Sequence, residues 1–176
     1  MNIFLIGFMG SGKSTIGKVL SQQLKMSFID LDEAIEKAQG KKVSDIFRDL
    51  GENKFREMEK QMIVETSKQD KQVIALGGGA PYFFDNMEFI NSVGLSIYLK
   101  MSANALKKRL LQLPPQARAS RPLIAIKTEK ELSDYVISTL EKRERFYNKA
   151  KLIVSNEEQD VSAALERIVK AIQYYK

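Results

Sequence analysis

The stretch GFMGSGKST at residues 7–15 is the sequence feature that most constrains the fold of this chain. It follows a short apolar run at residues 3–6 and precedes apolar residues at helical spacing, namely Ile16, Leu20 and Leu24. A loop of the form G-x-x-x-x-G-K-[ST] between a strand and a helix is typical of proteins that hold nucleotide phosphates. Its glycines let successive backbone N–H groups point inward, where side chains would crowd the phosphate. We therefore predict that residues 7–15 bind a nucleoside triphosphate and do not form a plain turn.

Two side chains of this loop have distinct expected roles. Lys13 should reach the β- and γ-phosphates from a solvent-facing loop, and the hydroxyl of Ser14 should ligate Mg²⁺. A helix that begins near Lys13 would add its free N–H groups and the positive end of its dipole. The other predicted ATP contacts in the loop are Gly10, Ser11, Gly12 and Thr15.

The composition narrows the class of protein. With 176 residues, 44% of them hydrophobic and 28% charged, we expect a single globular domain over residues 1–176. No apolar window is long enough to cross a bilayer and no signal peptide is present, so we expect a cytoplasmic protein without a membrane partner. The net charge of +6 suits anionic ligands, but the basic and acidic residues are interleaved, which argues against nucleic acid as a partner.

The chain contains neither histidine nor cysteine. The lack of cysteine excludes disulfides and thiolate metal sites. The lack of histidine removes the commonest general base and metal ligand. Any proton or metal chemistry must therefore run through carboxylates and hydroxyls.

Five apolar runs alternate with helical patterns along the chain. They lie at residues 3–6, 27–29, 73–76, 95–99 and 152–154. Several are almost continuously apolar, as parallel strands are when helices cover both faces of the sheet. Thr128 and Glu131 have the spacing of a capping box, which predicts a long helix through Tyr147. The alternation predicts an α/β fold, a three-layer doubly wound sheet of five parallel strands with ligands at their carboxyl ends.

One stretch interrupts the helical patterns. Residues 113–122 contain Pro114 and Pro115 followed by small and polar residues, and Pro122 follows Arg121. Prolines break helical order, and a residue that precedes proline favours extended backbone. We therefore predict a mobile lid over residues 113–124 that brings Arg121 to the phosphates when it closes.

Two candidate groups follow the second and third strands. One of Asp30 and Asp32 could hold the hydration shell of Mg²⁺, while the other accepts a hydrogen bond from an attacking hydroxyl. The alternative is a pair that caps the next helix, and the two roles are compatible. Residues 77–79 are three glycines where many proteins with such a phosphate-binding loop carry an aspartate, which favours Asp30 as the indirect Mg²⁺ ligand. The glycine N–H groups could meet an anion or hydroxyl, unless the segment is a plain turn.

Three arginines are candidates for binding anions. Arg56 and Glu59 are three positions apart on a predicted helix, which on its own favours a surface salt bridge. Arg143 continues an apolar line that includes Leu140, so it should point inward. It then needs an anionic partner, either a protein carboxylate or a substrate carboxylate. Arg109 lies at the edge of an inward-facing stripe, where it could stack on adenine.

Together these motifs resemble the shikimate kinases over almost the whole chain. The matching segments, in the family's order, are GFMGSGKST at 7–15, D-x-D at 30–32, FREME at 55–59, GGGA at 77–80, RPL at 121–123 and the Lys142-Arg143 pair before Tyr147. The resemblance implies a nucleoside-monophosphate-kinase-like fold with strand order 2-3-1-4-5. It implies a shikimate-binding region near residues 31–60 and a mobile lid. It also implies phosphorylation of the 3-hydroxyl of shikimate by ATP, on the route to chorismate and aromatic amino acids.

The resemblance further implies a role for each candidate residue. Asp32 would orient the 3-hydroxyl and help to deprotonate it, and Gly78 would contact a ring hydroxyl. Arg56 and Arg143 would hold the shikimate carboxylate. Arg121 would move with the lid onto the transferring phosphate. We expect a monomer that uses Mg²⁺ as its cofactor.

Two other functions stay open at this point. A gluconate kinase or nucleoside-monophosphate kinase would share the phosphate loop, although two arginines aimed at one carboxylate suit a small hydroxy acid better. An inactive module that senses nucleotide or binds nucleic acid would not need Asp32 or Arg121. Adenine contacts also stay open, because residues 155–158 differ from the arginine or proline that some relatives carry there.

Overall fold

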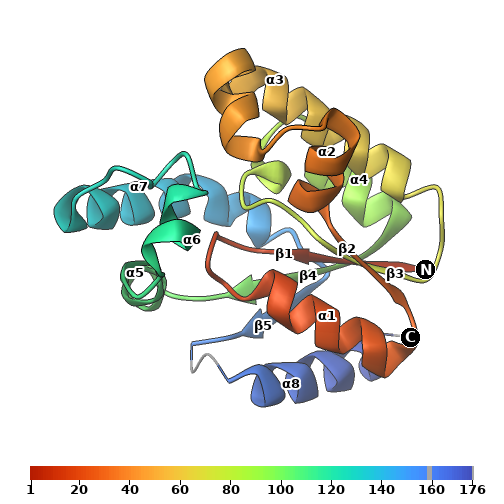
Figure 1. The fold of residues 1–176 in the computed structure, drawn as a ribbon. Coiled ribbons are helices and arrows are strands. Elements are labelled where there is room, and N and C mark those ends of the chain that lie inside the picture. The colour runs from red at the N-terminus through yellow and green to blue at the C-terminus, as the bar shows by residue number, and fades with distance from the viewer. Residues whose placement is uncertain (158–159, 176) are drawn as a thin grey trace.

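The computed structural model describes residues 1–157 and 160–175. Five parallel strands form one sheet in the order β2-β3-β1-β4-β5 (Figure 1). The strands are β1 (Asn2–Ile6), β2 (Ser27–Asp30), β3 (Gln72–Ala75), β4 (Gly94–Lys100) and β5 (Leu152–Ser155). The predicted strand order is confirmed, and each predicted run agrees with a strand to within one residue at either end.

Helices connect the strands. They are α1 (Lys13–Leu24), α2 (Leu31–Gln39), α3 (Val43–Thr66), α4 (Asn86–Val93), α5 (Ala103–Leu111), α6 (Pro115–Ala119), α7 (Glu129–Tyr147) and α8 (Val161–Tyr174), with a short 3₁₀ helix η1 (Ala80–Tyr82). The predicted start of α7 is confirmed, because Thr128 and Glu131 form both bonds of a capping box. Among the described residues, no helix combines the length and apolarity needed to cross a membrane.

The sheet is the middle of three layers. Figure 1 shows α1 and α8 on one face of the sheet and α2, α3 and α4 on the other. Side chains of β1 alternate between the two faces, and every residue of this strand is buried. Leu5 packs in the cluster with α1 and α8, whereas Phe4 and Ile6 pack with α3, α4 and α7. The predicted three-layer architecture is confirmed. The phosphate loop, residues 7–15, follows the carboxyl end of the central strand β1.

Two helices depart from the simplest expectation. α3 is interrupted at Gly51, whose φ of 79° and ψ of 169° lie outside the helical region, so two helical pieces meet there. The predicted lid is not free of helix, because α6 occupies Pro115–Ala119 within it. The physical reason is that proline is favoured in the first turn of a helix, where its missing N–H has no partner to lose.

Candidate active site

The loop between β1 and α1 is bent by three glycines. Gly7, Gly10 and Gly12 have φ angles of 146°, 82° and 95°, which residues with a Cβ rarely adopt. α1 begins at Lys13, directly after the last of these glycines. The first N–H groups of the helix therefore lie at the end of the loop, as in a phosphate-binding site.

Lys13 is buried inside this loop, so the expectation of a solvent-facing lysine is wrong. Only 9% of the residue is exposed, and its ammonium donates to the carbonyl oxygens of Gly7 and Phe8, both at 2.9 Å. The loop backbone thus folds over its own lysine. Burial lowers the pKa of Lys13 to about 8, although the nearby carboxylates of Asp32 and Asp30 act to raise it. The protonated form still predominates at pH 7, so the loop carries a positive charge.

Ser14 and Asp30 bring two oxygen donors together at the end of the loop. The Ser14 hydroxyl donates to Asp30 Oδ2 at 2.6 Å. Asp30 Oδ1 accepts the N–H of Asp32 at 3.1 Å and so caps α2, which confirms the capping alternative without excluding a second role. Mg²⁺ binds such oxygens while it keeps several waters and contacts substrate phosphates. In the described part of the chain, no group of three or more aspartate or glutamate side chains could hold an ion by itself. The donors present fit a Mg²⁺ ion shared with a nucleotide.

Asp32 lies in the first turn of α2. Burial raises the pKa of Asp32 to about 6, Asp30 adds to this shift, and Lys13 and Arg56 oppose it. Its Oδ1 is buried without a hydrogen-bond partner in residues 1–157 and 160–175. A carboxylate with an unpaired oxygen and a pKa close to neutrality is suited to accept a proton from a hydroxyl.

Arg56 and Glu59 form an ion pair in the interior, so the expectation of a surface salt bridge is wrong. The distance between Arg56 Nη1 and Glu59 Oε2 is 2.5 Å, with 4% and 0% of the side chains exposed. Glu52 accepts from the same guanidinium at 2.7 Å. The Arg56 guanidinium also lies 4.6 Å from the centre of the Phe83 ring. Spacing along a helix could not show that α3 turns this face toward the glycines after β3.

The glycines after β3 pack too closely against this pair for any side chain. A Cβ on Gly77 would lie 2.3 Å from Glu59 Oε1, and a Cβ on Gly79 would lie 2.6 Å from the Arg56 guanidinium. Neither glycine has a φ in the left-handed region. The segment therefore requires glycine for close approach of its backbone, and it is more than a plain turn.

Arg143 points inward from α7, as predicted. Only 6% of the residue is exposed, and its guanidinium carbon lies 5.9 Å from the centre of the Phe8 ring. No ion pair joins Arg143 to a carboxylate of the described residues, although Lys100 and Glu144 pair nearby in sequence. A buried guanidinium without a protein anion is costly. Of the two partners that the sequence left open, the structure favours a carboxylate on a ligand.

Two cavities adjoin at this end of the sheet. A cavity of about 460 Å³ is lined by residues that include Asp32, Phe47, Phe55, Arg56, Glu59 and Arg143. A cavity of about 320 Å³ is lined by residues that include Gly10, Gly12, Lys13, Ser14, Thr15, Asp30 and Arg109. Both cavities are lined by Met9, Asp32, Gly77, Gly78 and Arg121. A ligand of the acidic and arginine-rich cavity would thus lie beside a ligand of the phosphate loop.

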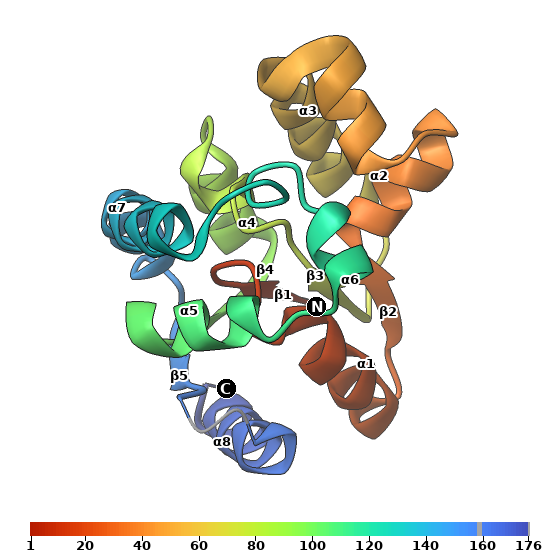
Figure 2. The same ribbon diagram turned by 60° about the vertical axis from the view of Figure 1, so that its left-hand side comes forward.

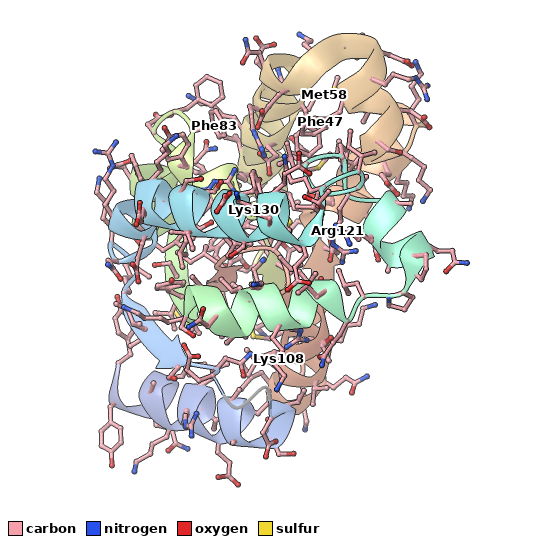
Figure 3. The ribbon with its side chains drawn as sticks, turned by 90° about the vertical axis from the view of Figure 1, so that its left-hand side faces the viewer. Phe47, Met58, Phe83, Lys108, Arg121 and Lys130 are labelled. Carbon is pink, nitrogen blue, oxygen red and sulfur yellow. The ribbon has the colours of Figure 1, made fainter. Side chains whose placement is uncertain are left out.

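Arg121 follows α6 and is half-buried. Its guanidinium donates to the carbonyl oxygen of Ala117, one turn earlier. Figure 2 shows α6 between α5 and α2, which line the smaller and the larger cavity respectively. In Figure 3 the side chain of Arg121 lies beside α6, on the side toward the rest of the molecule. The segment thus carries a positive charge to the place where the two cavities meet.

The order of these parts along the chain agrees with a known family. A family model for shikimate kinase matches residues 9–173. The chain belongs to the shikimate kinase family. It is a kinase that transfers a phosphoryl group from ATP to the 3-hydroxyl of shikimate, in aromatic amino-acid biosynthesis. Membership decides against the gluconate kinase, nucleotide kinase and inactive module that the sequence left open.

Individual relatives agree over nearly the full length. The shikimate kinase of Parabacteroides distasonis is 42% identical over 174 residues, which cover 95% of this chain and 98% of that one. The crystal structure of shikimate kinase from Bacteroides thetaiotaomicron superposes with a TM-score of 0.89 at 37% identity, covering 98% of each chain. Shikimate kinase from Acinetobacter baumannii, in complex with shikimate, gives a TM-score of 0.90 at 28% identity, covering 99% of this chain and 94% of that one.

The structure brings almost all predicted site residues of this shikimate kinase to the two cavities. Ser11 is the exception, because its side chain is fully buried and its N–H donates to the carbonyl oxygen of Phe8 at 3.1 Å. Arg109 reaches the smaller cavity from α5, and its Nη1 lies 3.7 Å from the position of a Cβ on Gly12.

Sequence reasoning gave no role to Asn156. This residue is 2% exposed, and its side-chain amide donates to the carbonyl oxygen of Ser11 at 2.8 Å. It therefore ties the end of β5 to the phosphate loop. Its place after a strand, at the carboxyl edge of a parallel sheet, was the available signal. Glu158, in the stretch considered for adenine contacts, lies outside the described residues.

Two aromatic side chains of the larger cavity were also missed. The rings of Phe47 and Phe55 lie 4.8 Å apart, and both line the wall beside Arg56. They come from α3 on either side of the break at Gly51. Periodicity predicts only an apolar stripe here, because it does not show the helix break that places Phe47 at the cavity.

Proposed function

We propose that the 320 Å³ cavity holds the phosphates of ATP, that the 460 Å³ cavity holds shikimate, and that the γ-phosphoryl group passes between them at their shared wall. The observation that carries this proposal is that Asp32 and Arg121 line both cavities. One acidic and one basic side chain thus reach the acceptor and the donor alike. In this proposal one domain over residues 1–176 contains a shikimate-binding region at 31–60 and a lid at 113–124.

The acceptor is held by its carboxylate and its hydroxyls. Arg56 and Arg143 bind the carboxylate through charge-assisted hydrogen bonds, which suit the planar guanidinium. Support comes from their position in the larger cavity and from the lack of an ion pair for Arg143 within the described residues. The backbone at Gly78 contacts a ring hydroxyl. The 3-hydroxyl faces Asp32, whose unpaired Oδ1 is available to it.

The donor is held by the phosphate loop. Gly10, Gly12, Lys13, Ser14 and Thr15 surround the smaller cavity with backbone and side-chain donors. The N–H of Ser11 turns inward within the loop and so contributes to its shape. Arg109 lies where it can contact adenine or the phosphates, and Arg121 adds positive charge from the lid.

Ser14 and Asp30 are the residues that would hold Mg²⁺, Ser14 through its hydroxyl and Asp30 through a water. When bound, the ion neutralises charge on the phosphates. Their 2.6 Å contact at the edge of the smaller cavity supports this assignment.

The transfer itself needs little covalent help from the protein. A bond forms between the 3-oxygen of shikimate and the γ-phosphorus, and the bond from that phosphorus to the β–γ bridging oxygen breaks. The hydroxyl proton goes to the carboxylate of Asp32. Lys13 and Arg121 place positive charge against the oxygens of the moving group. Positioning and charge are the main sources of rate in such reactions.

The proposal also covers the setting of the enzyme. We propose a monomer that works in the cytoplasm on small molecules, with no nucleic-acid or membrane partner. The interleaved charges support this view.

A panel of acceptors tests the proposed function. The purified chain is mixed with MgATP and, in turn, shikimate, gluconate or a nucleoside monophosphate, and ADP release is followed. Proton and phosphorus NMR of the product then locate the phosphate. We expect release with shikimate alone, phosphate on the 3-oxygen, and loss of turnover on chelation that Mg²⁺ restores. Turnover with another acceptor but not with shikimate would contradict the proposal.

A further inference from the structure

Tyr147 connects the end of α7 to the glycine segment of the larger cavity. It is the last residue of the helix, none of it is exposed, and its ring packs against that of Tyr98 at 5.1 Å. Its hydroxyl donates to the carbonyl oxygen of Gly78, 69 positions away in the sequence. The hydrogen bond thus joins two segments that carry parts of the proposed shikimate site.

This hydrogen bond fixes the orientation of one peptide group. The peptide bond from Gly78 to Gly79 is trans, as are all the peptide bonds described. In a planar trans peptide the C=O and the following N–H point in opposite directions. Because the C=O of Gly78 points to Tyr147, the N–H of Gly79 points away from it. Gly79 lines the larger cavity and Tyr147 does not. That N–H has no hydrogen-bond partner among the described residues, so it is a donor available to a ligand of the cavity.

The glycine segment has no other means of fixing this peptide. The carbonyl oxygen of Gly77 accepts from Ala80 at 3.1 Å and that of Gly79 accepts from Tyr82 at 2.9 Å, both within the segment. The carbonyl oxygen of Gly78 is held from outside, by Tyr147. A peptide between two glycines can rotate at little steric cost. Without the phenol, the N–H of Gly79 could turn out of the cavity.

The same helix also carries Arg143, one turn before Tyr147. Arg143 faces the larger cavity directly, and Tyr147 acts on the cavity through the backbone of Gly78. The Tyr147 hydroxyl also interacts with the Arg143 side chain, which opposes the rise in the pKa of the phenol. One helix therefore sets the separation between a cation for the carboxylate and an N–H donor for the substrate. Burial raises the pKa of the Tyr147 phenol to about 12, so the phenol remains a donor throughout the neutral range.

We propose that Tyr147 is a positioning residue for shikimate: its hydroxyl holds the peptide between Gly78 and Gly79 so that the N–H of Gly79 donates to the substrate. This inference rests on the proposed placement of shikimate in the larger cavity. Tyr147 itself does not touch the substrate.

The test is Tyr147→Phe, which keeps the ring and its packing. Loss of the hydrogen bond to Gly78 and of the contact with Arg143 should raise the KM and Kd for shikimate by at least about threefold to tenfold. The KM for MgATP should stay within about twofold, because the smaller cavity is not altered. The matched control is Tyr98→Phe, since the Tyr98 hydroxyl is buried without a partner in the described residues and its ring lies against Tyr147. This control should leave both KM values unchanged.

Analogues separate positioning from general damage to the cavity. Shikimate and its 4-deoxy, 5-deoxy and carboxamide analogues are compared as ligands of the wild type and of Tyr147→Phe. For the analogue in which the group bound by Gly79 is removed or altered, the penalty of the mutation should be much smaller than for shikimate. Equal penalties for all four ligands, or an unchanged shikimate Kd in Tyr147→Phe, would overturn the inference.

A measurement on the wild type covers the case in which Tyr147→Phe does not fold. The amide proton of Gly79 is followed by ¹H–¹⁵N NMR while shikimate is added. A downfield shift that saturates with binding is expected, and an unmoved Gly79 amide in the shikimate complex would refute the inference. If the wild type neither binds nor phosphorylates shikimate, the proposed function fails. If it does both and Gly79 is unaffected, only the role of Tyr147 fails.

Discussion

Arg56 and Glu59 form a 2.5 Å ion pair in the interior, with 4% and 0% of their side chains exposed. The pair lies under Gly77 and Gly79, whose missing side chains make room for it. It therefore holds the Arg56 guanidinium at the wall of the larger cavity. A buried pair of this kind is expected to be costly to break, because removal of one partner leaves the other charge unpaired.

Glu59→Ala should therefore lower the free energy of unfolding by about 3–5 kcal/mol and raise the KM for shikimate. Urea denaturation and steady-state kinetics measure the two effects. The control is Glu57→Ala on the same helix, which removes only the exposed pair with Lys54 at 2.7 Å. An exposed ion pair contributes little to the free energy of unfolding, so the control should be as stable as the wild type. Equal losses of stability in the two variants would show that the buried pair of Arg56 and Glu59 contributes no more than an exposed pair.

Arg143→Lys should weaken shikimate binding while ATP binding changes little. Lysine keeps the charge but cannot form the paired hydrogen bonds of a guanidinium with a carboxylate. Calorimetry with shikimate and with its carboxamide gives the comparison. The wild type should bind the carboxamide poorly, and the mutation should penalise the carboxamide less than the acid. Equal penalties would assign Arg143 to a partner within the protein.

Arg121→Ala should reduce kcat strongly with only a modest change in shikimate affinity. The reason is that its positive charge acts on the transferring phosphate after the lid closes. In the wild type, amide hydrogen exchange over residues 113–124 should slow when a non-hydrolysable ATP analogue and shikimate are both bound. Identical exchange with and without these ligands would make the segment a static loop.

The kcat/KM for shikimate should fall as the pH drops through about 6. The proton acceptor must be ionised, and burial raises the pKa of Asp32 to about 6. Activity is therefore present above this pH and is lost about tenfold per pH unit below it. The chain has no histidine whose titration near pH 6 could also change the pH profile. Burial also raises the pKa of Glu59, to about 7, so Glu59 is a second group that could cause such a fall. The fall in kcat/KM at low pH must therefore remain in Glu59→Gln. A profile that stays flat down to pH 5 at saturating MgATP would contradict this assignment.

Local sequence patterns were sufficient to predict much of the fold and part of the candidate site. The five strands, the capping box at Thr128 and the inward direction of Arg143 follow from periodicity and capping rules that act over a few residues. The buried position of Glu59 did not follow, because it depends on glycines after β3 that lie far away in sequence and leave space for a carboxylate. The hydrogen bond from Asn156 to the phosphate loop spans 145 positions, and no short pattern encodes it.

The lid and Lys13 show that local patterns can also mislead over a few residues. Its prolines predict an interruption of helix, yet Pro115 begins α6 because a proline in the first turn loses no hydrogen bond. Lys13 was expected in solvent because loops are usually exposed. Its burial arises from carbonyl groups of its own loop that turn toward the ammonium.

The most direct test of the central claim, that donor and acceptor meet at Asp32, is the kcat and the shikimate Kd of Asp32→Asn. Asparagine keeps the size of the side chain and can still bond to the hydroxyl, but it cannot take the proton. We expect kcat to fall by about 10²–10⁴ while the Kd from calorimetry changes only a few-fold. A kcat that is retained at saturating shikimate, together with a greatly raised Kd, would make Asp32 a binding residue only and would contradict the account.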